Sequence, residues 1–149
     1  MTGAAAERFV VFNLRLLAAS FAAVGVLFIA APDGTLSALD DFGAWLPLGD
    51  FTPAPETREQ LWLALGFAYM TVITGICLVV QADIVRYRPL LLVLAAGKAA
   101  SSLAALGFYL FDEHVFAYVL NFAVDGFLVG VSLLLWSLAG RVGDPAAAT

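Results

Sequence analysis

Two ionisable residues stand inside long apolar stretches of this chain: Lys98 in LLLVLAAGKAASSLAALGFYLF and Asp125 in VFAYVLNFAVDGFLVGVSLLLW. An unpaired charge in a lipid-spanning helix is costly, and opposite charges in such helices usually pair. Groups of this kind form ion pairs, carry protons or bind ligands. We therefore expect Lys98 and Asp125 to meet in the folded chain.

Three further polar residues lie at helical spacing from this pair. Ser101 and Ser102 follow Lys98 by three and four residues, so all three share one face of a helix. Asn121 precedes Asp125 by four residues and shares its face in the same way. These five residues predict a strip of polar side chains inside the protein, which we call the polar seam.

The connection between the two apolar stretches is short, so we can estimate which seam residues lie opposite each other on the two helices. We take Glu113 as the turn of a symmetric antiparallel hairpin. Asp125 then lies level with Ser101. Lys98 lies level with Leu128, about three residues or about 4.5 Å of helix rise from Asp125, which a lysine side chain spans. Because helical side chains lean toward their own N-terminus, a serine could bridge any remaining distance.

The polar seam allows two interpretations. As a structural clamp, the opposite charges lock two helices together inside the bilayer. As a functional site, the same groups bind a quinone or another lipophilic ligand, or pass protons. We favour the clamp and keep the ligand or proton site as the alternative.

Arg15 interrupts the start of the first apolar stretch together with Asn13. These polar residues favour a retained first helix over a cleaved signal peptide. Arg15 lies about two turns into that helix, close enough to its end for the guanidinium to reach lipid phosphates. The alternatives are that Arg15 binds the anionic headgroup of an acidic ligand or adds a second cation to Lys98.

The inventory of reactive side chains argues against several classes of protein. The single histidine, His114, cannot supply two axial ligands to a haem, and with the single cysteine, Cys77, it cannot form a zinc or iron–sulfur site within one chain. A nucleophile with its base and a glycine-rich phosphate loop are also missing. We therefore expect no catalytic residues, no metal and no cofactor. Nucleic-acid binding lacks the basic surface it requires.

The elements that carry these residues follow from composition. Of 149 residues, 62% are hydrophobic and 13% are charged, and the mean hydropathy is +0.95. Such a chain is an integral membrane protein whose first partner is the lipid bilayer. A hydrocarbon core about 30 Å thick requires about 20 helical residues. The sequence predicts an all-α, membrane-embedded four-helix bundle with helices near residues 9–31, 60–82, 89–111 and 115–139.

The charges outside these helices are divided between the two membrane faces. Arginines gather before the first helix, in the second connection from Asp83 to Arg88, and at Arg141 after the fourth helix. The first loop, residues 32–59, and the turn at residues 112–113 are acidic. Under the positive-inside rule, the tails at residues 1–8 and 141–149 both face the cytoplasm, with the chain in the inner membrane.

The long outer loop contains apolar residues at helical spacing. Thr35 could cap a short helix there, and Glu56 and Glu59 suit the start of the next membrane helix. We expect either a short amphipathic element on the outer membrane surface, with its tryptophan among the headgroups, or a lid over the outer end of the bundle. The apolar side chains of this segment are Leu36, Leu39, Phe42, Trp45, Leu46 and Leu48.

The order of these features resembles a known family. LRLLAASFAAVGVLFIAAP forms most of the first helix, an outer loop follows, and three further helices end with NFAVDGFLVG in the last. Over residues 14–139 this layout is similar to that of the small four-helix bacterial membrane proteins called DoxX-like. Members of this group are variously redox-complex subunits, accessory proteins and uncharacterised proteins. The resemblance therefore implies a fold more than an activity.

Two functions fit these observations. The first is a non-catalytic membrane subunit that anchors, assembles or stabilises a larger complex, with a respiratory or redox complex as one example; it requires a membrane-protein partner or a second copy of the chain. The second is a small-molecule module that binds quinone or another lipophilic ligand, or relays protons, around Lys98 and Asp125. A self-contained channel ranks third, because four helices leave little room for a pore.

Overall fold

The computed structural model describes residues 3–47, 50–56 and 60–142. Within these ranges the regular secondary structure is helical, apart from one isolated bridge between Thr52 and Val115. An all-α chain is therefore confirmed for the described residues. The helices are α1 (Gly3–Ala30), α2 (Pro32–Trp45), α3 (Gln60–Ala82), α4 (Ile84–Tyr87), α5 (Leu90–Phe111) and α6 (Phe116–Val142).

Four of these helices, α1, α3, α5 and α6, are long and apolar enough to cross a membrane. The shortest of them, α5, has 22 residues. At about 1.5 Å of rise per residue it extends about 33 Å, which matches a hydrocarbon core about 30 Å thick. Length and apolar character together therefore suit all four helices to a lipid environment.

The ends of the helices differ from the expected spans mainly at the two ends of the chain. α1 begins at Gly3 rather than near Phe9, so most of the expected tail at residues 1–8 is helical. The alanines that follow Gly3 are strong helix formers, which explains the extension. At the other end α6 continues through Arg141, and residues 143–149 of the expected tail lie outside the described residues.

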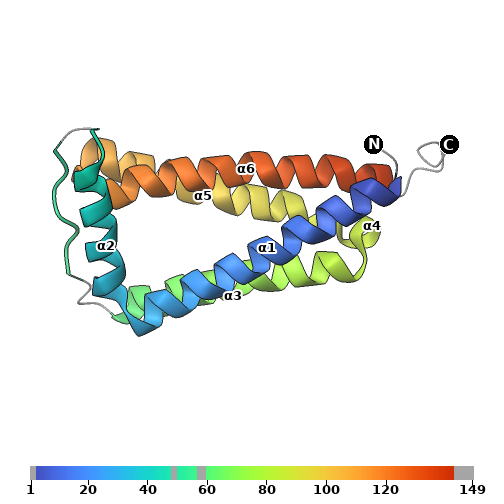
Figure 1. The fold of residues 1–149 in the computed structure, drawn as a ribbon, viewed down its shortest axis with the longest axis horizontal. Coiled ribbons are helices and arrows are strands. Elements are labelled where there is room, and N and C mark those ends of the chain that lie inside the picture. Colours follow the sequence, from blue (N-terminus) through green and yellow to red (C-terminus); the bar gives the residue numbers. More distant parts are fainter. Residues whose placement is uncertain (1–2, 48–49, 57–59, 143–149) are drawn as a thin grey trace.

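The long helices form two pairs. α5 packs along α6, and α1 packs along α3, whereas contacts between the two pairs are less extensive. Figure 1 shows the pairs close together at the end that carries α4, and separated toward the end where α2 lies. The fold is therefore two helical pairs that share a packed interior over only part of their length.

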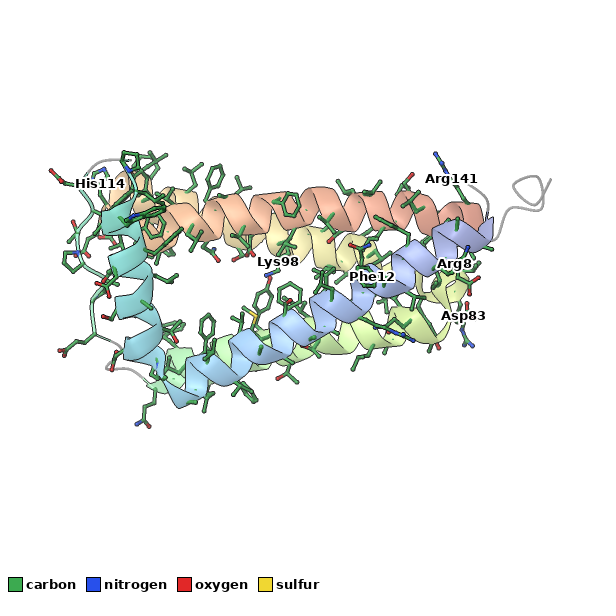
Figure 2. All side chains as sticks on the ribbon, in the orientation of Figure 1. Arg8, Phe12, Asp83, Lys98, His114 and Arg141 are labelled. Atoms are coloured by element: carbon green, nitrogen blue, oxygen red, sulfur yellow. The ribbon has the colours of Figure 1, made fainter. Side chains whose placement is uncertain are left out.

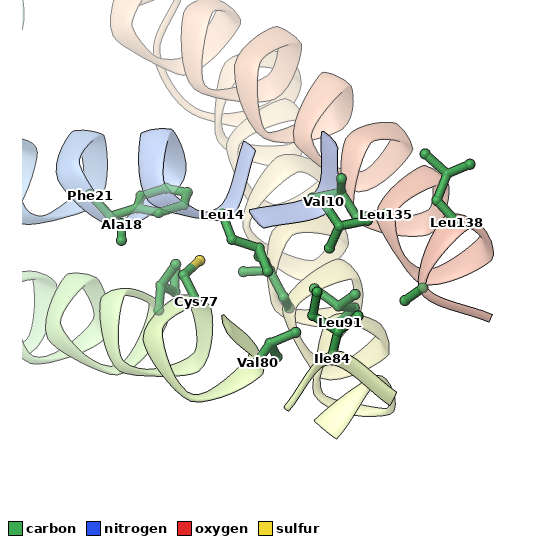
Figure 3. Packing of buried hydrophobic residues seen from close by; sticks show 13 residues of the cluster. Val10, Leu14, Ala18, Phe21, Cys77, Val80, Ile84, Leu91, Leu135 and Leu138 are labelled. Carbon is green, nitrogen blue, oxygen red and sulfur yellow. The ribbon is translucent and has the colours of Figure 1, made fainter. Parts of the chain in front are cut away.

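That shared interior consists of apolar side chains from both pairs and from α4 (Figure 3). On α1 the buried residues recur every three or four positions, which gives the helix a single inward face. Cys77 is fully buried here as a small apolar residue. The cluster comprises Val10, Leu14, Ala18, Phe21, Ile73, Cys77, Val80, Ile84, Leu91, Leu94, Leu135, Leu138 and Ala139.

The connection between α3 and α5 fastens one end of the molecule. Asp83 caps α4 by accepting a hydrogen bond from the backbone N–H of Arg86 (3.0 Å). Arg88 donates from Nε to the backbone carbonyl of Trp136 on α6 (2.8 Å), and its guanidinium lies 4.1 Å from the centroid of the Trp136 ring. The connection that leads from α3 to α5 is thereby fixed to α6 at the end that carries α4.

The outer loop forms a helix, α2, that starts earlier than the sequence suggested. Pro32 occupies its first turn, where a missing N–H costs nothing. Thr35 lies one turn inside and donates its hydroxyl to the carbonyl of Ala31 (2.7 Å). The expected cap at Thr35 is therefore wrong, because proline, rather than threonine, begins the helix.

α2 lies across the end of the molecule where the two pairs are separated (Figure 1). Gly43 is buried against Phe116 of α6, so closely that an added Cβ would lie 2.5 Å from the Phe116 ring. Trp45 at the end of α2 is 76% exposed. The helix thus packs on α6 through a glycine and presents a tryptophan outward, while Leu48 lies outside the described residues.

Candidate functional site

The predicted pair of charges is present in the structure. Lys98 on α5 donates from Nζ to Oδ1 of Asp125 on α6, at 2.9 Å. Lys98 is 2% exposed and Asp125 is 4% exposed, so the ion pair is buried. Figure 2 shows Lys98 in the middle of the molecule, between the α5–α6 pair and the α1–α3 pair.

The other three residues of the polar seam line the same helix interface. Asn121 donates from Nδ2 to the hydroxyl of Ser101 (3.2 Å). Ser102 is buried and donates its hydroxyl to the backbone carbonyl of Phe122 (2.8 Å). Each bond joins α5 to α6, so the five seam residues form successive contacts across one pair of helices.

The ion pair agrees with the estimated register, because the lysine side chain spans the expected offset of about three residues and contacts Asp125 directly, without a bridging serine. The rings of Phe108 and Tyr118, which the symmetric hairpin places level, lie 5.7 Å apart. The estimate differs from the structure in one contact: Ser101 contacts Asn121 instead of Asp125.

Lys98 also reaches the other helical pair. Its Nζ lies 4.5 Å from the centroid of the Phe21 ring on α1 and 5.3 Å from that of the Tyr69 ring on α3. Both distances suit a cation–π interaction, which is strongest where water is absent. The ammonium group of Lys98 is therefore the point at which all four long helices meet.

Tyr69 brings a second polar group to this point. Its hydroxyl oxygen is buried and has no hydrogen-bond partner, a condition shared among the described residues only by Oδ1 of Asp40. The hydroxyl lies beside Gly97 on α5, 3.4 Å from where a Cβ would be. Most buried polar atoms in proteins have a partner, so an unpaired hydroxyl beside a buried ion pair requires an explanation.

Sequence reasoning did not find the two aromatic members of the site. Phe21 has no distinguishing signal in an apolar helix. Tyr69 stands in the middle of an apolar stretch, where a hydroxyl is ordinarily explained by packing or by a bond to a neighbouring backbone carbonyl. A polar oxygen expected at mid-membrane depth was the signal that could have identified it, because such groups are costly in lipid unless they have a role.

Arg15 lies apart from the polar seam. It is on the exposed face of α1, with Arg8 and Phe12, whereas Leu14 and Ala18 point toward the shared interior. A shallow hollow beside it is lined by α1 residues alone, so it is an open surface. The structure does not bring Arg15 together with Lys98, and a contact with lipid headgroups remains a prediction.

The site has a simple charge balance. Among the described residues, Lys98 and Asp125 are the charged side chains that are buried, one positive and one negative. His114 is exposed and stacks edge-on against Tyr109, far from the pair in Figure 2. Within the described ranges, no group of three or more His, Cys, Asp or Glu side chains could hold a metal ion. The chemistry available at the site is hydrogen bonding and charge pairing.

Comparisons with protein-family models, with curated proteins and with solved structures find no match for this chain. The DoxX-like resemblance therefore stays a prediction. Interpretation of the site depends on two geometric features: the ion pair at the meeting point of four helices and the unpaired hydroxyl beside it.

Proposed function

We propose that this chain is a non-catalytic membrane subunit that anchors, assembles or stabilises a larger membrane complex, for example a respiratory or redox complex. The observation that carries the proposal is the Lys98–Asp125 pair, in which two opposite buried charges on α5 and α6 form an ion pair. A pair satisfied in this way holds helices together and leaves no free reactive group. The layout shared with DoxX-like proteins, some of which are complex subunits, agrees with this role.

The outer surface of the helices supports a role within a complex. Large apolar side chains are exposed on all four long helices, and they have to be covered by lipid or by another membrane protein. A second copy of the chain is one such partner. Examples at least half exposed are Phe12, Leu16, Val26, Leu61, Trp62, Leu65, Val93, Leu103, Leu110 and Phe127.

The proposed orientation is a four-helix bundle in the inner membrane with both termini in the cytoplasm. Gly3 lies beside the backbone of Arg141, so the first and last helices have ends at the same face, where Arg8 and Asp83 also lie (Figure 2). The arginines around α4 lie at this face, and α2 lies at the opposite one. The positive-inside rule assigns the arginine-rich face to the cytoplasm, which places Trp45 at the outer headgroups.

Native purification tests the accessory role. The chain should co-purify in mild detergent with a stoichiometric membrane protein or as a homo-oligomer, identified by mass spectrometry of the intact assembly. A chain that elutes as a lone monomer, when it is purified from its native membrane at its natural expression level, would contradict the proposal. An Asp125→Leu variant provides the control, since the buried charge that it leaves unpaired on Lys98 should destabilise the fold and remove the partner as well.

Single-cysteine labelling tests the orientation independently. With Cys77 replaced by serine, cysteines at Asp41 on α2 and at Arg86 on α4 should react from opposite sides of intact cells. The Asp41 position should react with an impermeant reagent added outside, and the Arg86 position should react only after the membrane is opened. Reaction of the Arg86 position from outside would reverse the topology.

A small-molecule module is the second candidate, and the unpaired hydroxyl of Tyr69 favours it. In this role the polar seam would line a site for quinone or another lipophilic ligand, or a proton path. The double variant Lys98→Met with Asp125→Leu separates the two candidates. If it folds and keeps its partner, the pair is a clamp; if it folds but loses ligand binding, the pair belongs to a binding site.

A further inference from the structure

The hydroxyl of Tyr69 is placed as a ligand-binding group would be. It is buried, it has no partner within the described residues, and its ring already contacts the ammonium group of Lys98. Its neighbour on α5 is Gly97, where an added Cβ would lie 3.4 Å from the oxygen. Among the described residues, this hydroxyl is the polar atom of α3 that reaches the meeting point without a partner.

Tyr69 lies at one end of the shared apolar interior. The shared apolar interior ends on α3 at Ile73, one turn from Tyr69, and on α1 at Phe21. Toward α2, the buried residues pack within one pair or against α2, as Gly25 does against Met70 and Phe116 does against Gly43. Tyr69 is itself only partly buried and packs against the cluster, so its ring lies at the edge of the packed interior while its hydroxyl is covered.

Charge balance limits what can bind there. The Lys98–Asp125 pair is already neutral, and no other buried charged side chain occurs in the described part of the chain. A charged headgroup at this point would leave one net charge in a medium of low dielectric constant, which is strongly unfavourable. An uncharged molecule leaves the ion pair intact.

The donors at the site define the headgroup further. The ammonium of Lys98 donates to Asp125 and faces the rings of Phe21 and Tyr69 with its remaining hydrogens. The tyrosine hydroxyl has one proton to donate, and a buried donor without an acceptor is the costly state. A carbonyl oxygen supplies the acceptor without adding charge.

We propose that Tyr69, at the edge of the Lys98–Asp125 site, binds an uncharged lipophilic molecule by donating its hydroxyl proton to a carbonyl oxygen of that molecule. This goes beyond the accessory role, and it gives a chemical class to the ligand of the second candidate function, on which it depends. The aromatic ring of Phe21 and the stem of Lys98 provide the apolar wall beside the carbonyl.

Undecyl methyl ketone, isotopically labelled at its carbonyl carbon, is a suitable probe for the purified chain in detergent micelles. Its carbonyl stretch in infrared spectra should show a protein-dependent band at lower frequency than the micelle band, because hydrogen bonding weakens the carbonyl bond. Tyr69→Phe removes only the hydroxyl and should abolish this band, with binding about tenfold weaker. Tyr109→Phe, near the far end of α5, is the matched control and should leave the band unchanged.

The stability of the ligand-free variants provides the second measurement. Since the Tyr69 hydroxyl has no partner to lose, Tyr69→Phe should unfold at the same denaturant concentration as the parent chain, or at a higher one. A Tyr69→Phe variant that is less stable and yet binds the ketone normally would overturn the proposal, because the hydroxyl would then have an internal structural partner.

Two charged probes with alkyl chains of similar length separate failure of this inference from failure of the function on which it depends. Dodecanoate and dodecylammonium should not displace the ketone. If either one binds at Lys98 and the ketone does not, a small-molecule site exists but its ligand class is wrong. If none of the three binds, the ligand site itself is refuted, while the accessory role, which is tested by co-purification, is unaffected.

Discussion

The two helical pairs are held together by different means. Between α1 and α3 the contacts are apolar and depend on glycine: an added Cβ at Gly25 would lie 3.1 Å from that of Met70, and one at Gly66 would lie 3.4 Å from the Phe28 ring. The hydroxyls of Thr71 and Thr74 on α3 donate to carbonyls of their own helix. The hydrogen bonds from Lys98 to Asp125 and from Asn121 to Ser101, each between two side chains, both join α5 to α6.

Between α5 and α6, polar contacts are added to apolar packing. The Lys98–Asp125 ion pair, the Asn121–Ser101 bond and the bond from Ser102 to the Phe122 carbonyl all cross from one helix to the other. In a bilayer, apolar helices gain little by leaving lipid for each other, so close packing of small residues and interhelical hydrogen bonds have to provide the association. The α1–α3 pair relies on the first means, whereas α5–α6 uses both, since an added Cβ at Gly126 would lie 3.3 Å from Oγ of Ser102.

The largest expected effect comes from breaking the ion pair on one side only. Lys98→Met or Asp125→Leu alone leaves an uncompensated buried charge, and each should lower the free energy of unfolding by about 3 kcal/mol. The double variant, which removes both charges, should recover most of that loss. Unfolding of the purified chain by a denaturing detergent, followed by circular dichroism, measures all three.

The ion pair would not be what joins α5 to α6 if the stability lost by the double variant equalled the sum of the losses of the two single variants. Additive losses would mean that each residue acts through its own neighbours rather than through the other. For Lys98 those neighbours are the rings of Phe21 and Tyr69, so the contact between the pairs would then outweigh the contact within α5–α6.

A smaller effect is expected from a change of shape in the apolar pair. Gly25→Val places a branched side chain where even a Cβ is only 3.1 Å from that of Met70, and overpacking of this kind costs about 2 kcal/mol. Gly75→Val on α3 is the matched control, since nothing lies within 4 Å of an added Cβ there. Equal stability of the two variants would show that α1 and α3 do not depend on close approach.

The polar contact of Asn121 should be weaker than the ion pair. Asn121→Leu and Ser101→Ala should each cost about 1 kcal/mol, and their coupling in a double-mutant cycle should be about 0.6 kcal/mol, as for other interhelical hydrogen bonds in membranes. Both residues are only partly buried, which limits the effect. A coupling energy of zero would mean that the bond between Asn121 and Ser101 does not help to join α5 to α6.

The difference between the pairs also explains what could be predicted from the sequence. Lys98 and Asp125 stand out because charges in apolar stretches are costly, and the short connection made their helices neighbours. The α1–α3 pair has no such markers. Which faces of α1 and α3 meet α5 and α6 depends on packing between residues far apart in the chain, so Phe21 and Tyr69 were not recognised as neighbours of Lys98.

Local signals were more reliable for helices than for their contacts. The spans of α3 and α5 agree closely with the predicted segments, because length and hydropathy determine a membrane-spanning stretch. The start of α2 was placed at Thr35, whereas Pro32 begins it. Within α5–α6 the ion pair was expected, but Ser101 contacts Asn121 and not Asp125, because the lean of helical side chains decides which of several nearby groups meet.

The smallest prediction compares one hydroxyl from each pair. Ser102 donates across to α6, whereas Thr74 donates to the carbonyl of Met70 in its own helix. Ser102→Ala removes an interhelical bond and should lower the free energy of unfolding by about 0.6 kcal/mol. Thr74→Val keeps the shape of the side chain and removes a hydrogen bond that lies within one helix. The free energy of unfolding should therefore hardly change, as measured in the same detergent titration.

The outcome of this pair of variants bears directly on how the helices associate. A loss confined to Ser102→Ala would mean that hydroxyls stabilise the chain only where they join two helices. Equal losses would mean that satisfying a hydroxyl in lipid matters more than where its partner lies, and then the polar seam would differ from α1–α3 only in carrying a charge. In that case the ion pair alone would distinguish the two pairs, and the rest of the seam would be ordinary membrane packing.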